Sequence, residues 1–198
     1  MAGPHENLET AEKSEAASHG GNKKIALLIS VLALFLAFSE TLGKAAQTEG
    51  ISLNIKASDA WNFFQAKTIR QTMLRTAAET MSVQIPAVTD EAAKAAMTKQ
   101  VESWQKTAAR YESDPKEKDG RKELREQAHT FEHDRDMHLA RYHQYEIASA
   151  LFQIGIVLAS AEIITAIVLL GWLSALAGFV GLIFMGIGLW APHAVHLI

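Results

Sequence analysis

The chain has 198 residues, with 19 Lys and Arg, 22 Asp and Glu, and a formal net charge of −3. The absence of cysteine excludes disulfides, zinc–thiolate sites and thiol catalysis. Residues 44–146 contain 16 basic and 16 acidic residues, and this balance provides no polybasic patch, so we expect no nucleic-acid partner.

The first 42 residues are predicted to form a polar tail and a membrane span. Residues 1–22 contain too few apolar residues to offset the entropy of ordering, which predicts a disordered tail. Residues 23–42 are predicted as transmembrane helix 1, whose last 18 residues extend over roughly 27 Å. A cleaved signal peptide is the competing interpretation, but Ser39–Gln47 offers no convincing cleavage site.

Residues 43–146 are predicted as an extramembrane helical region. An alternation of apolar and polar residues over 51–55 would also fit a strand, but no other segment could pair with it. A helix with Trp61 and Phe64 follows and ends before Pro86. Its apolar residues are spread around the axis, which indicates a helix contacted on several sides.

The clearest helical pattern covers Asp90–Tyr111, with Asp90 as the predicted N-cap. Apolar residues recur there every three or four positions and form one stripe, which requires a partner surface. The stripe consists of Ala93, Met97, Val101, Trp104, Ala108 and Tyr111.

A further helix is predicted to start at Pro115, capped by Asp114, and to continue into the second span. Seven-residue spacing within it is typical of two helices that wind around each other, so we predict a coiled-coil-like stalk. The predicted stalk interface comprises Trp61, Phe64, Met97, Trp104, Tyr111, Leu124, Phe131, His138, Tyr142 and Tyr145.

The C-terminal part is predicted as a membrane hairpin. Residues 147–170 form transmembrane helix 2, Gly171–Ser174 the turn, and residues 175–191 transmembrane helix 3. A soluble hairpin is disfavoured because Ile147–Trp190 contains a single charged residue, Glu162. Small residues at helical spacing predict packing within the hairpin or between protomers. The predicted packing residues are Gly155, Ala159, Gly178, Gly181 and Leu182.

Two acidic residues are candidates for a role inside the membrane. A carboxylate within a span is costly and must be protonated, paired or placed in a polar cavity. Glu162 lies about 22 Å into the second span, whereas Glu40 lies near the end of the first, so antiparallel spans place them at different depths. We favour a structural carboxyl at Glu162 over an ion or proton path.

The candidate metal ligands are Glu126, His129, His133 and Asp136. His129 and His133 are one helical turn apart, and Glu126 and His129 have the Glu-x-x-His spacing of di-iron bundles. A di-iron bundle needs a second such motif, which is missing, so a solvated polar face is the favoured interpretation. We expect no cofactor, and no motif for enzymatic catalysis is present.

Two segments carry a resemblance to a known family. They are Ala57–Arg70 (ASDAWNFFQAKTIR) and Arg141–Ser160 (RYHQYEIASALFQIGIVLAS). Together with the three-span order, they resemble a bacterial membrane family described only as a domain of unknown function, number 4337. The resemblance covers roughly residues 20–190. It implies an inner-membrane location but no activity. The family often has basic residues in the terminal turn, and their absence from Ala166–Ser174 leaves the orientation and the end of the second span open.

The predicted fold is an all-α membrane protein with one N-terminal transmembrane helix, a long extramembrane helical hairpin and a C-terminal two-helix transmembrane hairpin. The expected function is that of a non-enzymatic, homo-oligomeric scaffold or assembly protein, whose stalk could also bind a protein partner. The alternative is a channel or transporter subunit in which Glu162 and the glycine-rich hairpin line a polar path. Lys23 and Lys24 favour a cytoplasmic N-terminus, whereas Arg135 and Arg141 favour the opposite orientation.

Overall fold

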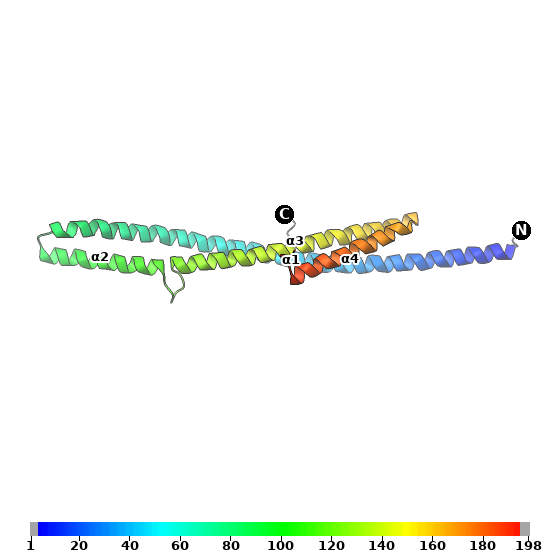
Figure 1. The fold of residues 1–198 in the computed structure, drawn as a ribbon, viewed down its shortest axis with the longest axis horizontal. Coiled ribbons are helices and arrows are strands. Elements are labelled where there is room, and N and C mark those ends of the chain that lie inside the picture. The colour runs from blue at the N-terminus through cyan, green and yellow to red at the C-terminus, as the bar shows by residue number, and fades with distance from the viewer. Residues whose placement is uncertain (1–3, 195–198) are drawn as a thin grey trace. The chain divides into compact units, whose positions relative to one another are not determined.

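The structure is a computed structural model that describes residues 4–194, with side chains for residues 23–194. The described residues form four α-helices and one 3-10 turn, without any strand, which confirms the all-α class (Figure 1). In chain order these elements are α1 (Pro4–Gln84), η1 (Ile85–Ala87), α2 (Glu91–Glu112), α3 (Arg121–Thr165) and α4 (Val168–Trp190).

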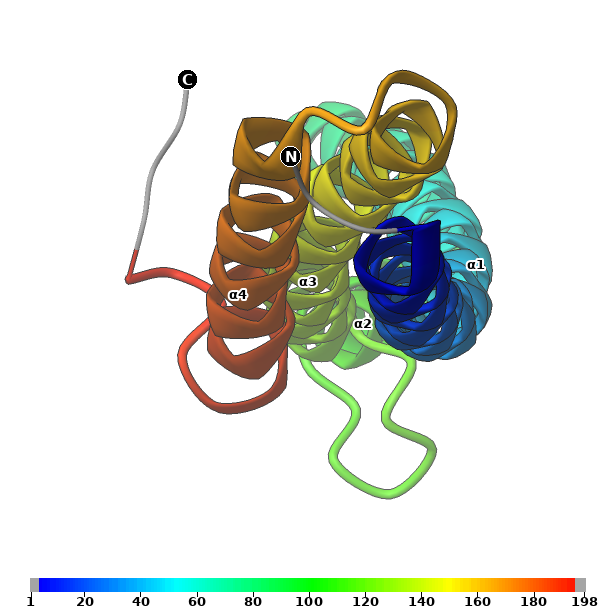
Figure 2. The same ribbon diagram turned by 90° about the vertical axis from the view of Figure 1, so that its right-hand side faces the viewer.

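The chain divides into two units, and α1 and α3 contribute to both. The terminal unit consists of Met1–Glu49 and Met137–Ile198, and the central unit of Gly50–Asp136. In the central unit, α1 lies antiparallel to α2 and beside the first turns of α3 (Figure 1). In the terminal unit, α3 and α4 form a hairpin beside α1 (Figures 1 and 2).

The length of α1 follows from the absence of proline between Pro4 and Pro86. The helix includes residues 51–55, as predicted in preference to a strand. It also includes residues 4–22, for which a disordered tail was predicted, while residues 1–3 lie outside the described part. This segment is rich in Ala and Glu, which are good helix formers, and it extends a helix that the apolar run already nucleates.

One face of α1 is covered throughout the central unit. Its buried and half-buried residues recur at alternating spacings of three and four, which is the pattern of a coiled-coil interface. This inner seam consists of Leu53, Ala57, Ala60, Phe64, Lys67, Gln71, Leu74, Ala78 and Met81. The predicted stripe of α2 is also buried or half-buried, from Ala93 to Tyr111, as are Leu124 and Phe131 of α3. The stripes that were predicted to need a partner therefore find one within the chain.

The core of the terminal unit joins its three helices. Leu32 of α1 and Ala148 and Phe152 of α3 form a buried cluster, and Phe152 is 0% exposed. Phe35 stacks on Phe152 with ring centroids 5.9 Å apart. Two buried hydroxyls add hydrogen bonds between helices. The Ser39 hydroxyl donates to the Tyr145 carbonyl (2.8 Å), and the Ser174 hydroxyl donates to the Gly155 carbonyl (2.7 Å).

The turn of the C-terminal hairpin lies earlier than predicted. The second helix was expected to reach Leu170, but α3 ends at Thr165 and α4 already begins at Val168. Ala166 adopts the left-handed conformation with φ 56°, and its N–H donates to the Glu162 carbonyl at 2.8 Å. This is the bond that closes a helix at a left-handed residue, so the reversal needs only two residues. The predicted turn Gly171–Ser174 is part of α4.

The start of α2 agrees with the prediction, because the Asp90 carboxylate accepts a hydrogen bond from the Ala92 N–H at 3.0 Å. The start of α3 does not. A helix was predicted from Pro115, but the segment after Pro115 forms only a single turn, and α3 begins at Arg121. Lys118 has φ 55° in the left-handed region, which ends this turn before a helix can continue.

Candidate functional site at the helix junction and at Glu162

Arg121, the first residue of α3, connects all three helices of the central unit. Its Nε donates to the Thr68 hydroxyl at 2.8 Å, and its Nη1 donates to Gln71 Oε1 and to Glu112 Oε2, the latter at 2.8 Å. The guanidinium also lies 5.1 Å from the ring centre of Phe64. Because a guanidinium presents its donors in a fixed plane, these contacts hold the start of α3 in one orientation on α1.

Gln71 is the polar centre of this junction and is only 1% exposed. Its Nε2 donates to the Ala108 carbonyl at 3.0 Å and to Glu112 Oε2 at 2.8 Å, while its Oε1 accepts from Arg121. Both ends of the buried amide are therefore satisfied, which avoids the cost of an unpaired polar group.

The loop between α2 and α3 is bound to Glu123, the third residue of α3. Glu123 accepts hydrogen bonds from the Ser113 hydroxyl and from the Asp114 N–H. Gly120 lies against the same group, since an added Cβ would meet the Glu123 carboxylate and would lie 2.7 Å from Ser113 Cα. Any larger residue at position 120 would therefore displace the loop.

Trp61 of α1 also belongs to the junction and contacts α3. Its indole N–H donates to Glu132 Oε1 at 2.9 Å, and its ring meets Phe64 and His129 edge-on, with centroids 5.5 and 5.2 Å away. The Nδ1 of His129 lies 3.0 Å from Glu132 Oε2. Trp61, one of the predicted stalk-interface residues, thus contacts α3 from α1.

Three carboxylates of the junction have lowered pKa values. Hydrogen bonds from Gln71 to Glu112, from Ser113 to Glu123, and from Trp61 to Glu132 are the largest causes. A carboxyl group whose pKa is depressed by folding stabilises the fold above its unfolded pKa, and this contribution is lost as the pH falls through the folded pKa.

We therefore expect the junction to loosen only below about pH 4.5, the ordinary pKa of these groups. The measurement is the fluorescence of Trp61 during acid titration, in a variant whose other three tryptophans, Trp104, Trp172 and Trp190, are replaced by phenylalanine. Glu132→Gln should diminish this transition, because the indole then faces an uncharged amide and only Glu112 and Glu123 still contribute. A transition centred above pH 4.5 in the parent would contradict the prediction.

The predicted metal ligands do not come together. Among the residues that the structure describes, no group of three or more His, Asp or Glu side chains could hold a metal ion. His129 pairs with Glu132, and Asp136 pairs with Arg135 at 2.9 Å. Glu126 and His133 border the same open surface as two basic residues, Lys122 and Arg125. The metal hypothesis is therefore wrong for this arrangement. Two of the predicted ligands are paired with neighbouring side chains, and the other two lie beside basic residues whose positive charge would repel a cation.

A second polar site lies in the terminal unit around Glu162. Because α3 ends at Thr165, Glu162 lies one turn from the end of the helix rather than well inside it. Its Oε2 is buried and has no hydrogen-bond partner among the described residues. A Cβ on Gly171 would collide with this carboxylate, so the glycine leaves room for it. The residues around this pocket of about 200 Å³ are Lys24, Ile25, Leu28, Glu162, Val168, Gly171, Trp172 and Ala175.

Glu40 and Glu162 lie at different positions along the helices of the terminal unit. The Oε1 of Glu40 accepts a hydrogen bond of 3.5 Å from Gln153, which precedes Glu162 by nine residues on α3. Nine residues of helix extend over about 14 Å. The two carboxylates therefore lie too far apart to form an acidic pair.

Most of the small residues predicted to pack helices are buried between helices of this chain. Gly155, Ala159, Gly178 and Gly181 are all buried. A Cβ on Gly178 would lie 2.5 Å from Leu32 Cδ2, and one on Gly181 would lie 2.8 Å from the ring of Phe152. Leu182 differs from the other four residues, because it is 40% exposed.

Several residues of these sites were not anticipated. Gln71 and Lys67 occupy positions of the inner seam, and Lys67 pairs with Asp119 at 2.6 Å. Their spacing from Phe64 and Leu74 is the pattern that could have revealed them. Arg121 offered no such pattern, because its role depends on where α3 begins.

Three helices of the described chain are long and apolar enough to cross a membrane, and their apolar windows are only 11%, 28% and 17% buried. The protein is thus an all-helical chain with three candidate membrane spans. The family model described as "Domain of unknown function (DUF4337)" matches residues 21–191, and the chain belongs to this family. No curated protein and no solved structure matches it. The segment Ala57–Arg70, on which the resemblance rests, supplies Trp61, Phe64 and Thr68 to the junction.

Proposed function

We propose that this protein crosses the bacterial inner membrane three times, carries its charged central unit outside the bilayer, and acts as a non-enzymatic, homo-oligomeric scaffold. The layout is supported by the three apolar helices, whose exposed side chains would be covered by lipid. The absence of an enzymatic role is supported by the junction, where the polar groups of Gln71, Glu112 and Arg121 are engaged with one another.

The observation that carries the proposal is a second seam on α1, opposite the inner seam. It repeats at spacings of four and three residues, contains no charged residue, and is exposed throughout. Ile69 is 61% exposed, Met73 66% and Val83 80%. This outer seam consists of Asn62, Ala66, Ile69, Met73, Thr76, Thr80 and Val83. An exposed apolar stripe on a charged unit is typical of an interaction surface.

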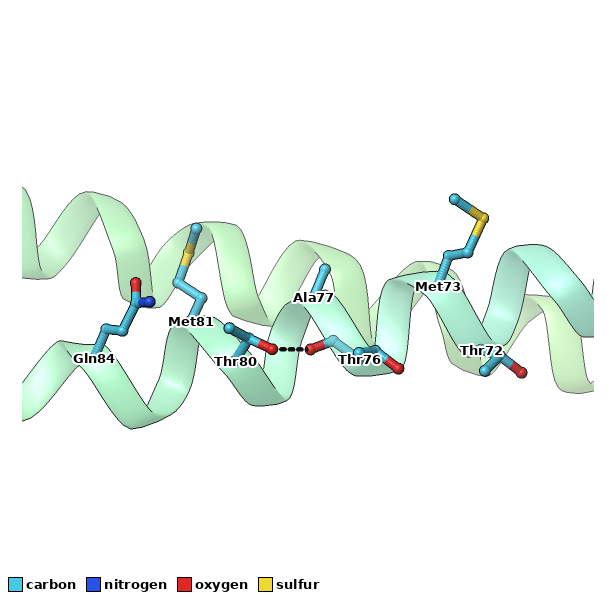
Figure 3. Close-up of a pocket in the computed structure, with 7 residues that line it drawn as sticks. All are labelled: Thr72, Met73, Thr76, Ala77, Thr80, Met81 and Gln84. Atoms are coloured by element: carbon cyan, nitrogen blue, oxygen red, sulfur yellow. Dashed lines mark hydrogen bonds between the residues drawn. The ribbon is translucent and has the colours of Figure 1, made fainter.

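Thr80 makes the outer seam less polar than its composition suggests. In Figure 3, Met73, Thr76 and Thr80 border an open groove along α1. The hydroxyl of Thr80 donates to the Thr76 carbonyl at 2.8 Å. Because this hydroxyl is satisfied by its own helix, an approaching helix gains little by hydrogen bonding to it and would pack on its methyl group and on methionine.

A second copy of α1 is the partner that fits this seam. From Asn62 to Val83 the repeat extends over three heptads, about 33 Å, the geometry of a parallel coiled coil. Chains anchored in the same membrane present α1 in parallel and at high effective concentration. Asn62 would hydrogen-bond to its own copy and define the register. Asp59 is the preceding position of the same repeat. In a parallel pair its carboxylate would face the carboxylate of the second copy, and the two charges would repel, so we place the start of the pairing at Asn62.

The absence of cysteine permits a direct test. In full-length protein in lipid nanodiscs, a single Met73→Cys substitution is expected to give a disulfide-linked dimer on mild oxidation, because this position would face itself across the parallel pair. Thr98→Cys, on the exposed side of α2, is the matched control and should remain monomeric. The measurement is the dimer fraction on a non-reducing gel.

A second arm replaces Ile69 and Met73 by aspartate, with Ala95→Asp and Thr98→Asp on α2 as the control pair. Only the outer-seam pair should convert the oligomer to a monomer, because it places like charges in the interface. A parent protein that is monomeric in nanodiscs, or equal behaviour of the two pairs, would overturn the proposal.

The channel alternative has less support. The glycine side of α4 is occupied by Leu32 and Phe152, and Glu162 lies near a helix end rather than along a path. Ion flux in liposomes that is lost in Glu162→Gln would favour the channel over the scaffold.

A further inference from the structure

We propose that the pocket at Glu162 binds the headgroup of a phospholipid that carries both a phosphate and a primary ammonium, as in phosphoethanolamine lipids. This inference rests on the proposed membrane layout, but it is independent of oligomerisation through the outer seam. The pocket is formed by α1, α3 and α4 together, all within the terminal unit.

The position of the pocket along the helices fits a headgroup. Lys24 immediately precedes the apolar run that begins at Ile25, and the turn at Ala166–Ile167 follows Glu162 by one helical turn. In the proposed layout both features lie where the hydrocarbon ends. The indole of Trp172, which is 73% exposed beside the pocket, is a side chain that prefers this interfacial zone.

The anionic side of the pocket is suited to a primary ammonium. Glu162 Oε2 is shielded from solvent and lacks a donor among the described residues, so the protein itself leaves this acceptor unpaired. Leaving a buried acceptor unpaired is costly, and a charged N–H donor would offset that cost. Gly171 lets the carboxylate occupy this wall of the pocket, because any side chain at position 171 would collide with it.

The cationic side is suited to a phosphate. Lys24 supplies a full positive charge on the pocket wall. Val168, the first residue of α4, is also on this wall, and the preceding Ile167 has no side chain that could cap the helix. The Leu170 N–H donates to the Ile167 carbonyl, but the N–H groups of Val168 and Leu169 have no side-chain cap, and the helix dipole adds to the attraction of Lys24 for an anion.

The two halves together favour one class of headgroup. A choline headgroup carries a quaternary ammonium without N–H donors, so it could not satisfy Glu162. A glycerol headgroup could reach Lys24 through its phosphate, but it offers no positive charge to the carboxylate. Phosphoethanolamine provides an anion and an N–H cation a few bonds apart, which matches a pocket with one charge of each sign.

The test uses the full chain in nanodiscs with equal amounts of phosphatidylethanolamine, phosphatidylcholine and phosphatidylglycerol, and native mass spectrometry to count retained lipids. The parent should retain phosphatidylethanolamine over phosphatidylcholine by about tenfold, the factor expected for one charge-assisted hydrogen bond. Glu162→Gln should lose this preference and keep phosphatidylglycerol. Lys24→Gln should weaken the retention of both phosphatidylethanolamine and phosphatidylglycerol.

Glu40→Gln is the matched control, because it neutralises a carboxylate about 14 Å away along the helices and should leave lipid selection unchanged. Circular dichroism of each variant verifies that the helices remain folded. Equal retention of the three lipids by the parent, or equal effects of Glu40→Gln and Glu162→Gln, would overturn the proposal. So would displacement of the lipid by soluble glycerophosphoethanolamine at comparable concentration, which would identify a free headgroup as the ligand. Extraction of the chain from membranes by carbonate would instead contradict the membrane layout itself.

Discussion

Replacing Gly181 with alanine is expected to destabilise the terminal unit by about 1–3 kcal/mol, the usual cost of adding a methyl group to a filled core. The new Cβ would lie 2.8 Å from one carbon of the Phe152 ring and 3.1 Å from two others. Phe152 is 0% exposed and stacked on Phe35, so the ring has no free space into which it could move. The measurement is the free energy of unfolding by titration with sodium dodecyl sulfate in mixed micelles.

Gly186→Ala provides the matched control on the same helix. A Cβ at this position would meet only the ring of Trp190, at an ordinary distance of 3.5 Å. Alanine has a higher helix propensity than glycine in water-soluble peptides, so Gly186→Ala should leave the free energy of unfolding unchanged or raise it slightly. Equal losses at positions 181 and 186 would show that α4 does not pack on Phe152 as described.

Arg121→Met is expected to release the start of α3 from α1 and α2. The substitution retains most of the apolar stem but removes the donors to Thr68, Gln71 and Glu112. Because Gln71 is only 1% exposed, its Oε1 would then be buried without a donor, at a cost of about 1–3 kcal/mol. Hydrogen exchange of the backbone amides in residues 113–136 should become faster, whereas exchange in residues 25–40 should not change.

Arg70→Met removes an arginine from the exposed side of α1 and is the appropriate comparison. It should leave the exchange of residues 113–136 at the parent rate. If both variants accelerate exchange equally, the effect is one of net charge, and the junction would not depend on the specific contacts of Arg121.

The sequence predicted helices and apolar stripes well where large apolar residues recur. The stripe of α2 was found because Met97, Val101 and Trp104 stand out against charged neighbours. The inner seam of α1 was missed because much of it is alanine, with Lys67 and Gln71 between Phe64 and Leu74. Small residues fill such a seam because they permit a close approach of helices, and they carry little hydrophobic contrast. The stripes of α2 and α3 were therefore predicted to need a partner surface, but the residues of α1 that cover them were not identified.

The turn of the C-terminal hairpin was misplaced for a related reason. Glycine is the common residue at a left-handed helix end, so Gly171 was taken as the turn. The structure places Ala166 in that conformation instead and uses Gly171 to accommodate Glu162. Glycine in the C-terminal hairpin thus indicates close approach between helices, at positions 171, 178 and 181, rather than chain reversal. Only the contacts between helices distinguish the two uses, and a single sequence does not contain them.

The two opposed seams of α1 restrict which changes of length the protein can accept. Inner and outer positions alternate within every heptad, so a single inserted residue would turn the following helix by about 100° and expose the residues that now pack on α2. An insertion of seven residues would restore both faces to within about 20°. Substitutions on the outer seam, by contrast, leave the inner seam untouched. The outer seam can therefore diverge by substitution, while the length of this helix can change only in steps of whole heptads.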